Sequence, residues 1–233
     1  MDNAVVLLWL EGPLQSWGVD SLFSRRASLN FPTRSGVLGL ICAALGAKGE
    51  QTELLACFQP FRQTVLAYAR SGKSVERPLQ LRDFHMVGNG YDDKDDWETL
   101  HIPKTSEGKK AVGGGAKLTY RYFVQDMAFA VALGVPVHLA EHLEQALQFP
   151  CWDISLGRRC CVPVEFVYQG LFAAEEQALE KAAGLAGSKN RQEVFRVCEG
   201  SHVGEERILA DVPLRFGPQK LYAKRMVTII AAG

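Results

Sequence analysis

The stretch most suggestive of catalysis is HLAEH at 138–142, which matches the H-x-x-E-H arrangement of inverted zinc peptidases. Two histidines four residues apart lie on one face of a helix and together bind a metal ion. Such a peptidase also needs a third ligand downstream, and no later segment supplies one. The other explanation is an amphipathic helix flanked by two histidines, and we favour it.

Other arrangements typical of catalysis or nucleotide binding do not occur in the sequence. It has no G-x-S-x-G turn and no G-x-x-x-x-G-K-[ST] loop, and GNGYDD at 88–93 lacks the third glycine of a dinucleotide-binding loop. The acidic residues of 92–98 would repel one another, which favours a solvated loop. We therefore expect no catalytic residue, no metal and no cofactor.

Basic side chains gather in four stretches that hold few acidic residues. No acid occurs in 21–35 or in 215–225, two arginines are adjacent at 158–159, and 101–125 has five basic residues against one acid, a net of +4. Aromatic residues lie among them. Because the whole chain has 26 basic and 26 acidic residues, any binding of nucleic acid must be local. Phosphate neutralisation with base stacking is typical of proteins that bind single-stranded RNA.

The order of predicted elements indicates an α+β fold. Strand, helix, strand, strand, helix and strand follow one another, which is the split βαβ pattern of a ferredoxin-like domain. A Gly-rich, partly acidic insertion at 88–118 interrupts this order, and a C-terminal extension at 173–233 adds a helix over 174–186 and two or three further strands. The predicted strands are 4–10, 63–70, 120–134, 164–172 and 221–230, and the other predicted helices are 35–46, 52–58 and 140–149.

The segment FPTRSGVLGLICAALG at 31–46 holds the helix predicted to be most deeply buried, because it is apolar on nearly every side. Thr33 or Ser35 is placed to cap its start, and Gly46 its end. The amide groups of the first turn, together with Arg34 and Ser35, are expected to form a phosphate site.

Composition also limits the cellular setting. The apolar run near the start is too short to cross a bilayer, and the first residues lack the basic region of a secretory signal. The six cysteines show no regular spacing. We expect a protein of the reducing cytoplasm with no membrane partner.

Four motifs occur in an order that resembles the Cas5 family of CRISPR-associated proteins, most closely its subtype I-E form. They are LEGPLQSWG after the first strand, FPTRSGVLGL at the first helix, LRDFHMV at 81–87 and LGRRCC at 156–161. The resemblance covers about residues 5–163, and the C-terminal part is less diagnostic.

This resemblance implies a ferredoxin-like (RAMP-type) domain over 1–87 and 119–172, with 88–118 as a protruding, thumb-like β-hairpin. It further implies a non-catalytic subunit of the Cascade complex that grips the 5′ handle of the CRISPR RNA and caps the backbone filament. The implied partners are that RNA, the backbone subunit Cas7, the large subunit Cas8 and, indirectly, target DNA. The candidate RNA-binding residues are Trp17, Arg25, Arg26, Arg34, Ser35, Lys104, Lys109, Lys110, Lys117, Arg121, Arg158 and Arg159.

Two alternatives stay open at this point. In subtype I-C the Cas5 member is a metal-independent ribonuclease that cuts the CRISPR RNA precursor, and this chain offers side chains of the required types. They are Lys117, Tyr120, Tyr122, His85 and His101. The second alternative is a free-standing RNA- or protein-binding module with a similar fold outside any CRISPR system.

Overall fold

A computed structural model describes residues 3–18, 24–72, 80–87, 92, 94–102, 104–105, 107–111 and 117–232. Its central element is a seven-stranded sheet in which all neighbouring strands are antiparallel. In spatial order the strands are β10 (Tyr168–Phe172), β1 (Asn3–Glu11), β9 (Ala128–Pro136), β6 (Gln63–Arg70), β11 (Arg191–Glu199), β13 (Leu221–Ala231) and β12 (Glu205–Arg215).

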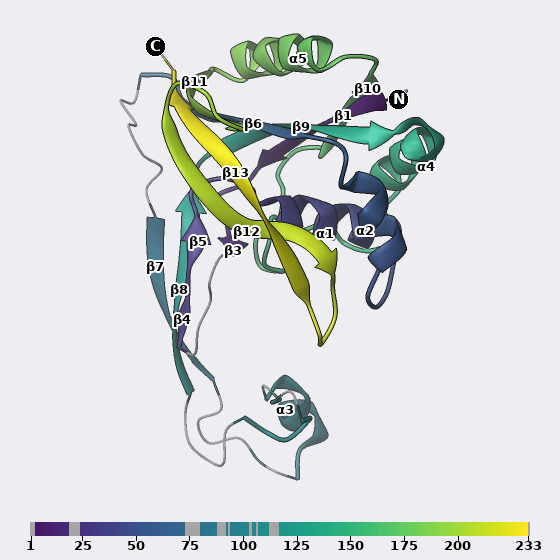
Figure 1. Cartoon of the computed structure of the whole chain (residues 1–233). Helices are drawn as coiled ribbons and strands as arrows, with labels where there is room; N and C mark the ends of the chain where they lie inside the picture. Colours follow the sequence, from purple (N-terminus) through teal and green to yellow (C-terminus); the bar gives the residue numbers. More distant parts are fainter. Residues whose placement is uncertain are drawn as a thin grey trace.

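Helices cover both faces of this sheet, as Figure 1 shows. Even-numbered residues of β1 pack toward α1 (Arg34–Ala44), α2 (Thr52–Phe58) and α4 (Val137–Gln148), and odd-numbered ones pack toward α5 (Glu175–Ser188). Helix α5 presents Ala178, Ala182 and Ala186, spaced at four residues so that they share one helix face. Burial on both sides explains why β1 is a nearly continuous apolar run, and the expected α+β class is confirmed.

Helix α1 begins and ends close to the predicted positions. Thr33 precedes it, and its Oγ1 accepts a hydrogen bond from the amide of Gly36 at 3.1 Å. Gly46 follows it with φ +68°, and the amides of Gly46 and Ala47 donate to the carbonyls of residues 43 and 42. This ending uses the left-handed conformation that glycine adopts at low cost.

The single strand predicted over 120–134 is wrong, because the chain turns in its middle. Strand β8 (Lys117–Gln125) ends just before Asp126, which has φ +50°, and β9 begins at Ala128 in a different sheet. The amide of Asp126 donates to the carbonyl of Pro13, and its own carbonyl accepts from Arg191. The strand predicted over 164–172 is also shorter, because only its end forms β10, although Val164 and Val167 each form one backbone hydrogen bond with β1.

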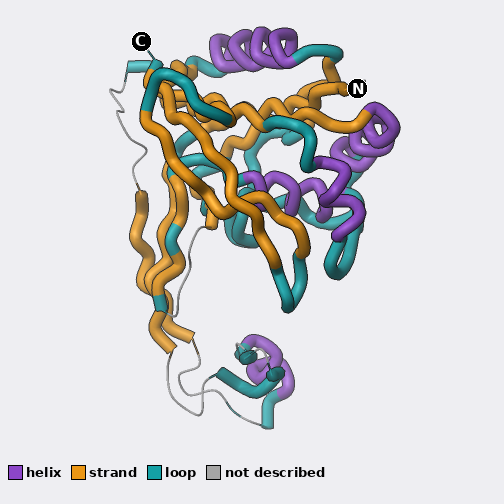
Figure 2. The backbone as a smooth tube through the Cα atoms, in the orientation of Figure 1, coloured by secondary structure: helices purple, strands orange, loops and turns teal. Residues whose placement is uncertain are grey.

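A second sheet forms a hairpin that extends away from the seven-stranded sheet (Figure 2). Strand β7 (Gln80–Val87) pairs antiparallel with β8, and β4 (Arg25–Arg26) pairs with β8 in parallel. The short α3 (Asp96–His101) lies beyond the far end of the hairpin. The paired strands begin before residue 88 and continue past 118, so the hairpin extends beyond the bounds predicted for the insertion. Strand β8 also pairs with β2 (Leu14–Gln15), and β3 (Trp17–Gly18) pairs with β5 (Ser28–Leu29).

The C-terminal strands belong to the main sheet. Strand β11 pairs with β6, and the long β12–β13 hairpin continues the sheet and folds over α1, as Figure 1 shows. Within the described part of the chain, no helix is long and apolar enough to cross a bilayer.

Candidate nucleic-acid interface

Three of the four motif segments meet in one cleft of about 610 Å³ at the start of α1. The motif residues that line it are Ser16, Gly18, Thr33, Ser35, Gly36, Gly157 and Arg158, and Arg26 and the β12–β13 hairpin supply the rest. We call this hollow the basic cleft. The fourth motif, at 81–87, forms β7 in the projecting hairpin.

Two glycines allow the cleft segments to approach closely. A Cβ atom on Gly157, which has φ +94°, would lie 1.8 Å from the carbonyl oxygen of Ser16. A Cβ atom on Gly36 would lie 2.8 Å from the ring of Trp17. The amide of Ser16 also donates to the carbonyl of Leu156 at 3.0 Å. Glycine is therefore required at position 157, and the loop that carries Arg158 is held against residue 16.

Arg158 is the cation with the most unusual surroundings in the cleft. Its guanidinium lies 4.8 Å from the centre of the Phe123 ring, and its Nη2 donates to the carbonyl of Arg26 at 3.0 Å. Its Nη1 is buried without a partner within the described residues. Burial lowers the pKa of Arg158, and the charges of Arg121 and Arg26 lower it further. An anion bound beside these cations would relieve the repulsion among them.

Other predicted cations lie beside Arg158 along β8. Arg26 is exposed and lines the cleft, while the guanidinium of Arg25 lies 4.9 Å from the centre of the Tyr122 ring. The Nε of Arg121 donates to Thr119 Oγ1 at 3.3 Å. The parallel pairing of β4 with β8 brings Arg121 beside Arg25 and Arg26, although it lies much later in the chain.

Arg34, in contrast, does not face the cleft. Its side chain is 2% exposed, its Nη1 lies 2.6 Å from Glu199 Oε1, and its Nη2 donates to the carbonyls of Phe58 and Phe61. Burial lowers the pKa of Arg34, although the charge of Glu199 acts in the opposite direction. The prediction that this guanidinium binds phosphate has no support in this geometry, because Glu199 and two backbone carbonyls already hold it.

The predicted phosphate site on the α1 amides is also occupied by the protein itself. The amide of Arg34 donates to Asp211 Oδ2 at 2.8 Å, and that of Gly36 donates to Thr33. Ser35 is half-buried and lines the basic cleft, where its hydroxyl contacts Thr33 Oγ1 at 3.3 Å. Of the two residues predicted for the phosphate site, Arg34 and Ser35, only Ser35 lines the cleft.

A second arginine completes the network around Arg34. Arg225 contacts Asp211 Oδ1 at 2.7 Å and Glu199 Oε1 at 2.6 Å. Burial lowers the pKa of Arg225, but its hydrogen bond with Asp211 and the nearby carboxylates outweigh this, and the pKa is raised overall. We call Arg34, Glu199, Asp211 and Arg225 the buried ion network. It joins the start of α1 to the β12–β13 hairpin.

Trp17 is also part of the interior. Its side chain is fully buried, its Nε1 donates to Gln15 Oε1 at 3.2 Å, and its ring packs beneath Gly36. The prediction that Trp17 contacts RNA has no support in this geometry, because its ring is fully buried. Its indole belongs to the main hydrophobic core instead.

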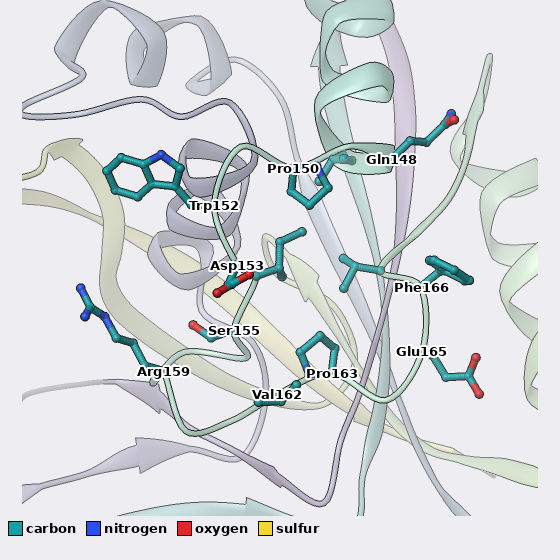
Figure 3. A pocket seen from close by; sticks show the side chains of 13 residues that line it. Gln148, Pro150, Trp152, Asp153, Ser155, Arg159, Val162, Pro163, Glu165 and Phe166 are labelled. Carbon is teal, nitrogen blue, oxygen red and sulfur yellow. The ribbon is translucent and has the colours of Figure 1, made fainter.

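Arg159 lines a different hollow, shown in Figure 3. This hollow of about 650 Å³ has a mostly apolar lining, with Trp152 and Phe166 at its edge. The ring of Phe166 is 86% exposed. The two adjacent arginines of the LGRR motif therefore serve separate surfaces, and only Arg158 joins the basic cleft.

The predicted lysines lie on the projecting hairpin, away from the cleft. Lys104 pairs with Lys110 in an isolated bridge, and Lys109 forms an exposed ion pair with Glu107 at 3.2 Å. The backbone of Lys117 begins β8, and its side chain lies outside the described residues.

Two of the described side chains considered for ribonuclease chemistry, His85 and Tyr120, do not face each other. In the β7–β8 pairing, His85 lies opposite Thr119, whereas Phe84 lies opposite Tyr120. Neighbouring residues of a strand point to opposite faces, so His85 and Tyr120 lie on different sides of the hairpin. The side chain of His101 lies outside the described residues.

The histidines of HLAEH are exposed on α4, which begins at Val137. Among the described residues, no group of three possible metal ligands lies close enough to hold an ion.

Sequence reasoning missed the contribution of the C-terminal hairpin to the cleft. Phe216, Lys220 and Tyr222 all line it. The absence of acidic residues from 215–225 marked this stretch as basic, but nothing local indicated that it meets residues 16–36.

Comparison with known proteins defines the class of molecule that carries this cleft. Residues 5–228 match the family described as "CRISPR-associated protein (Cas_Cas5)". The chain therefore belongs to the Cas5 family of CRISPR-associated proteins, as the four motifs indicated.

Individual relatives agree with this assignment. The chain is 30% identical over 182 residues to "CRISPR system Cascade subunit CasD" of Escherichia coli (strain K12), which covers 75% of this chain and 74% of that protein. Its structure is similar to a chain of a "CRISPR RNA-guided surveillance complex", with a TM-score of 0.71 and 26% identity over 98% of this chain and 90% of that one. A "Crystal structure of Cas protein" is also similar, with a TM-score of 0.59 and 26% identity over 97% and 94% of the two chains.

Proposed function

We propose that this protein is a non-catalytic, CRISPR RNA-binding subunit of a Cascade-type surveillance complex. In this role it grips the 5′ handle of the RNA and caps one end of the backbone filament. The observation that carries the proposal is the basic cleft, where Arg26 and Arg158 have no carboxylate partner within the described residues. The names of the relatives support the assembly, since one is a Cascade subunit and another belongs to an RNA-guided complex.

The hydrogen-bond donors of the cleft are of the kinds that bind an RNA backbone. Guanidinium groups bind phosphate oxygens through paired, charge-assisted hydrogen bonds, and Arg158 has an unused nitrogen for such a bond. The Ser35 hydroxyl and Lys220 add further donors to the same hollow. Since the chain is neutral overall, this local charge would attract the RNA, whereas the rest of the surface would bind nucleic acid only weakly.

The proposal includes the ferredoxin-like arrangement of the domain and its division at 1–87, 88–118, 119–172 and 173–233. Apart from the projecting hairpin and the short strands, β1 is followed along the chain by α1 and α2, then β6 and β9, then α4 and β10. These four strands lie in the spatial order β10-β1-β9-β6, all antiparallel. This order supports the βαββαβ arrangement expected for the family.

We propose that other surfaces of this protein contact the subunits Cas7 and Cas8. We also propose that the complex forms in the cytoplasm. The hollow beside Arg159 exposes Trp152, Val162 and Phe166, and the projecting hairpin exposes Phe84 and Met86. A monomer seldom exposes such groups of large apolar side chains, whereas a subunit covers them on assembly. The hairpin would act as the thumb that lies near target DNA.

The proposal is tested by co-expression with the other subunits and a CRISPR array. Replacing Arg26 and Arg158 together by glutamine is expected to lower the RNA recovered per complex several-fold, because two phosphates are then left without a cationic partner. Lys224→Gln is the matched control, since Lys224 is an exposed cation outside the cleft. An unchanged RNA content in the double variant, measured on folded protein, would contradict an RNA-binding role for the cleft.

A further inference from the structure

The β12–β13 hairpin contributes two kinds of side chain to the basic cleft. Lys220 is exposed and cationic, and Tyr222 is half-buried and aromatic. The other cleft segments supply guanidinium, hydroxyl and glycine groups but no aromatic ring. A site that holds single-stranded RNA usually pairs a cationic path for the backbone with an aromatic surface for the bases.

We infer that Tyr222 stacks on a base of the bound RNA while Lys220 pairs with the neighbouring phosphate, so that the C-terminal hairpin forms part of the RNA site. The inference rests on the proposed function of the cleft. It gives the C-terminal segment, the part of the chain with the weakest family resemblance, a direct contact with the ligand.

Tyr222 is better placed for stacking than the other aromatic residue in the lining. Phe216 packs against the main hydrophobic core, so its ring is engaged with the protein. Tyr222 lies opposite Pro213 in the β12–β13 pairing and belongs to neither core cluster. A tyrosine ring offers a flat surface with little conformational freedom to lose, which suits a stacking contact.

The hairpin is held in place before any ligand arrives. Arg225, three residues after Tyr222, is joined to Asp211 and Glu199 in the buried ion network. At the turn, the amide of Phe216 donates to the carbonyl of Glu50 at 2.9 Å. A site that is already ordered loses little entropy on binding. Asp211, although it lines the cleft, is neutralised by Arg225 and does not repel phosphate.

The test uses the purified full-length protein and a short, fluorescently labelled single-stranded RNA, with affinity measured by fluorescence anisotropy. Tyr222→Ala is expected to weaken binding roughly 5- to 150-fold, the effect of removing the stacking surface for one base. Tyr222→Phe keeps the ring and is expected to bind within about twofold of the parent, since stacking needs only the ring face. Lys220→Ala should weaken binding and reduce the salt dependence of the affinity. Lys224→Ala, in β13 but outside the cleft, should do neither.

The outcomes separate this inference from the proposed function. If Tyr222→Ala and Lys220→Ala bind like the parent while Arg26→Gln and Arg158→Gln bind weakly, the hairpin is not part of the RNA site and the proposed function stands. If all four variants bind like the parent, both fail. If Tyr222→Phe loses as much affinity as Tyr222→Ala, the contact is made by the hydroxyl group and stacking is excluded. Circular dichroism identifies any variant that is unfolded. If Tyr222→Ala is unfolded, the comparison of Lys220→Ala with Lys224→Ala tests the inference in its place.

Discussion

The arginines near the start of α1 form two groups that differ in what faces them. In the buried ion network, Arg34 and Arg225 meet Glu199 and Asp211 at 2.6–2.8 Å, and both arginine side chains are less than 10% exposed. In the basic cleft, Arg158 is half-buried beside other cations, and its Nη1 is buried without a partner within the described residues.

The difference shows that a basic stretch of sequence does not by itself define a ligand site. Arg26 and Arg34 belong to one stretch without acidic residues, yet only Arg34 acquires carboxylate partners, from residues more than 160 positions later in the chain. A buried, paired guanidinium stabilises the fold, whereas an unpaired one retains the capacity to bind an anion. The predictions below test this contrast.

The largest effect is expected in the buried ion network. Arg34→Ala should lower the free energy of unfolding by about 3–5 kcal/mol, because it removes a buried ion pair with Glu199 and the side-chain donor to the Phe61 carbonyl. Urea denaturation of the variant measures this. Arg26→Ala, at an exposed site, should change stability by less than about 0.5 kcal/mol. Equal stability of the two variants would remove the distinction between the groups.

A smaller loss is expected from the loop that positions Arg158. Gly157→Ala should cost about 1–3 kcal/mol of stability, because φ +94° strains any residue with a Cβ atom and Ser16 occupies the space. The same change should weaken RNA binding, since Arg158 would move. Thermal unfolding and an RNA titration measure the two effects. Unchanged stability would mean that this loop approaches residue 16 less closely than the structure indicates.

The cleft cations should affect affinity rather than stability. Replacing Arg26 and Arg158 by glutamine should weaken RNA binding roughly tenfold and reduce the salt slope by about 0.7 for each phosphate that is no longer neutralised. Anisotropy titrations over a series of KCl concentrations measure both quantities. A weaker affinity with an unchanged salt slope would argue that these arginines act through packing, not through phosphate.

The smallest effect on folding is expected from the end of the projecting hairpin. Replacing residues 92–111 by a short Gly-Ser linker should change the free energy of unfolding by less than about 0.5 kcal/mol, because α3 lies away from both sheets (Figure 1). Assembly with the other subunits should nevertheless be impaired, as the proposed function requires. Denaturation and co-purification measure these effects. A marked loss of stability would show that this segment supports the core.

The fold was predictable wherever the pattern is local. The apolar run of α1, its Thr33 cap and Gly46 at its end all act within a few residues, and the helix was placed correctly. The strand over 120–134 was predicted wrongly, because alternation continues through Asp126 while contacts with Pro13 and Arg191 turn the chain there. Those contacts come from distant segments, and periodicity contains no information about them.

The sequence by itself determined the family, through four motifs in order, and it located most of the basic stretches. Only the tertiary structure decided which cations remain available, because availability depends on whether a carboxylate from another part of the chain lies within reach. Arg34, which the motif pattern singled out, forms an ion pair with Glu199. Arg158 has no carboxylate partner within the described residues, and a hairpin near the C-terminus brings Lys220 into the same cleft. The physical reason is that burying a charge requires a partner, and only the folded chain determines which charges receive one.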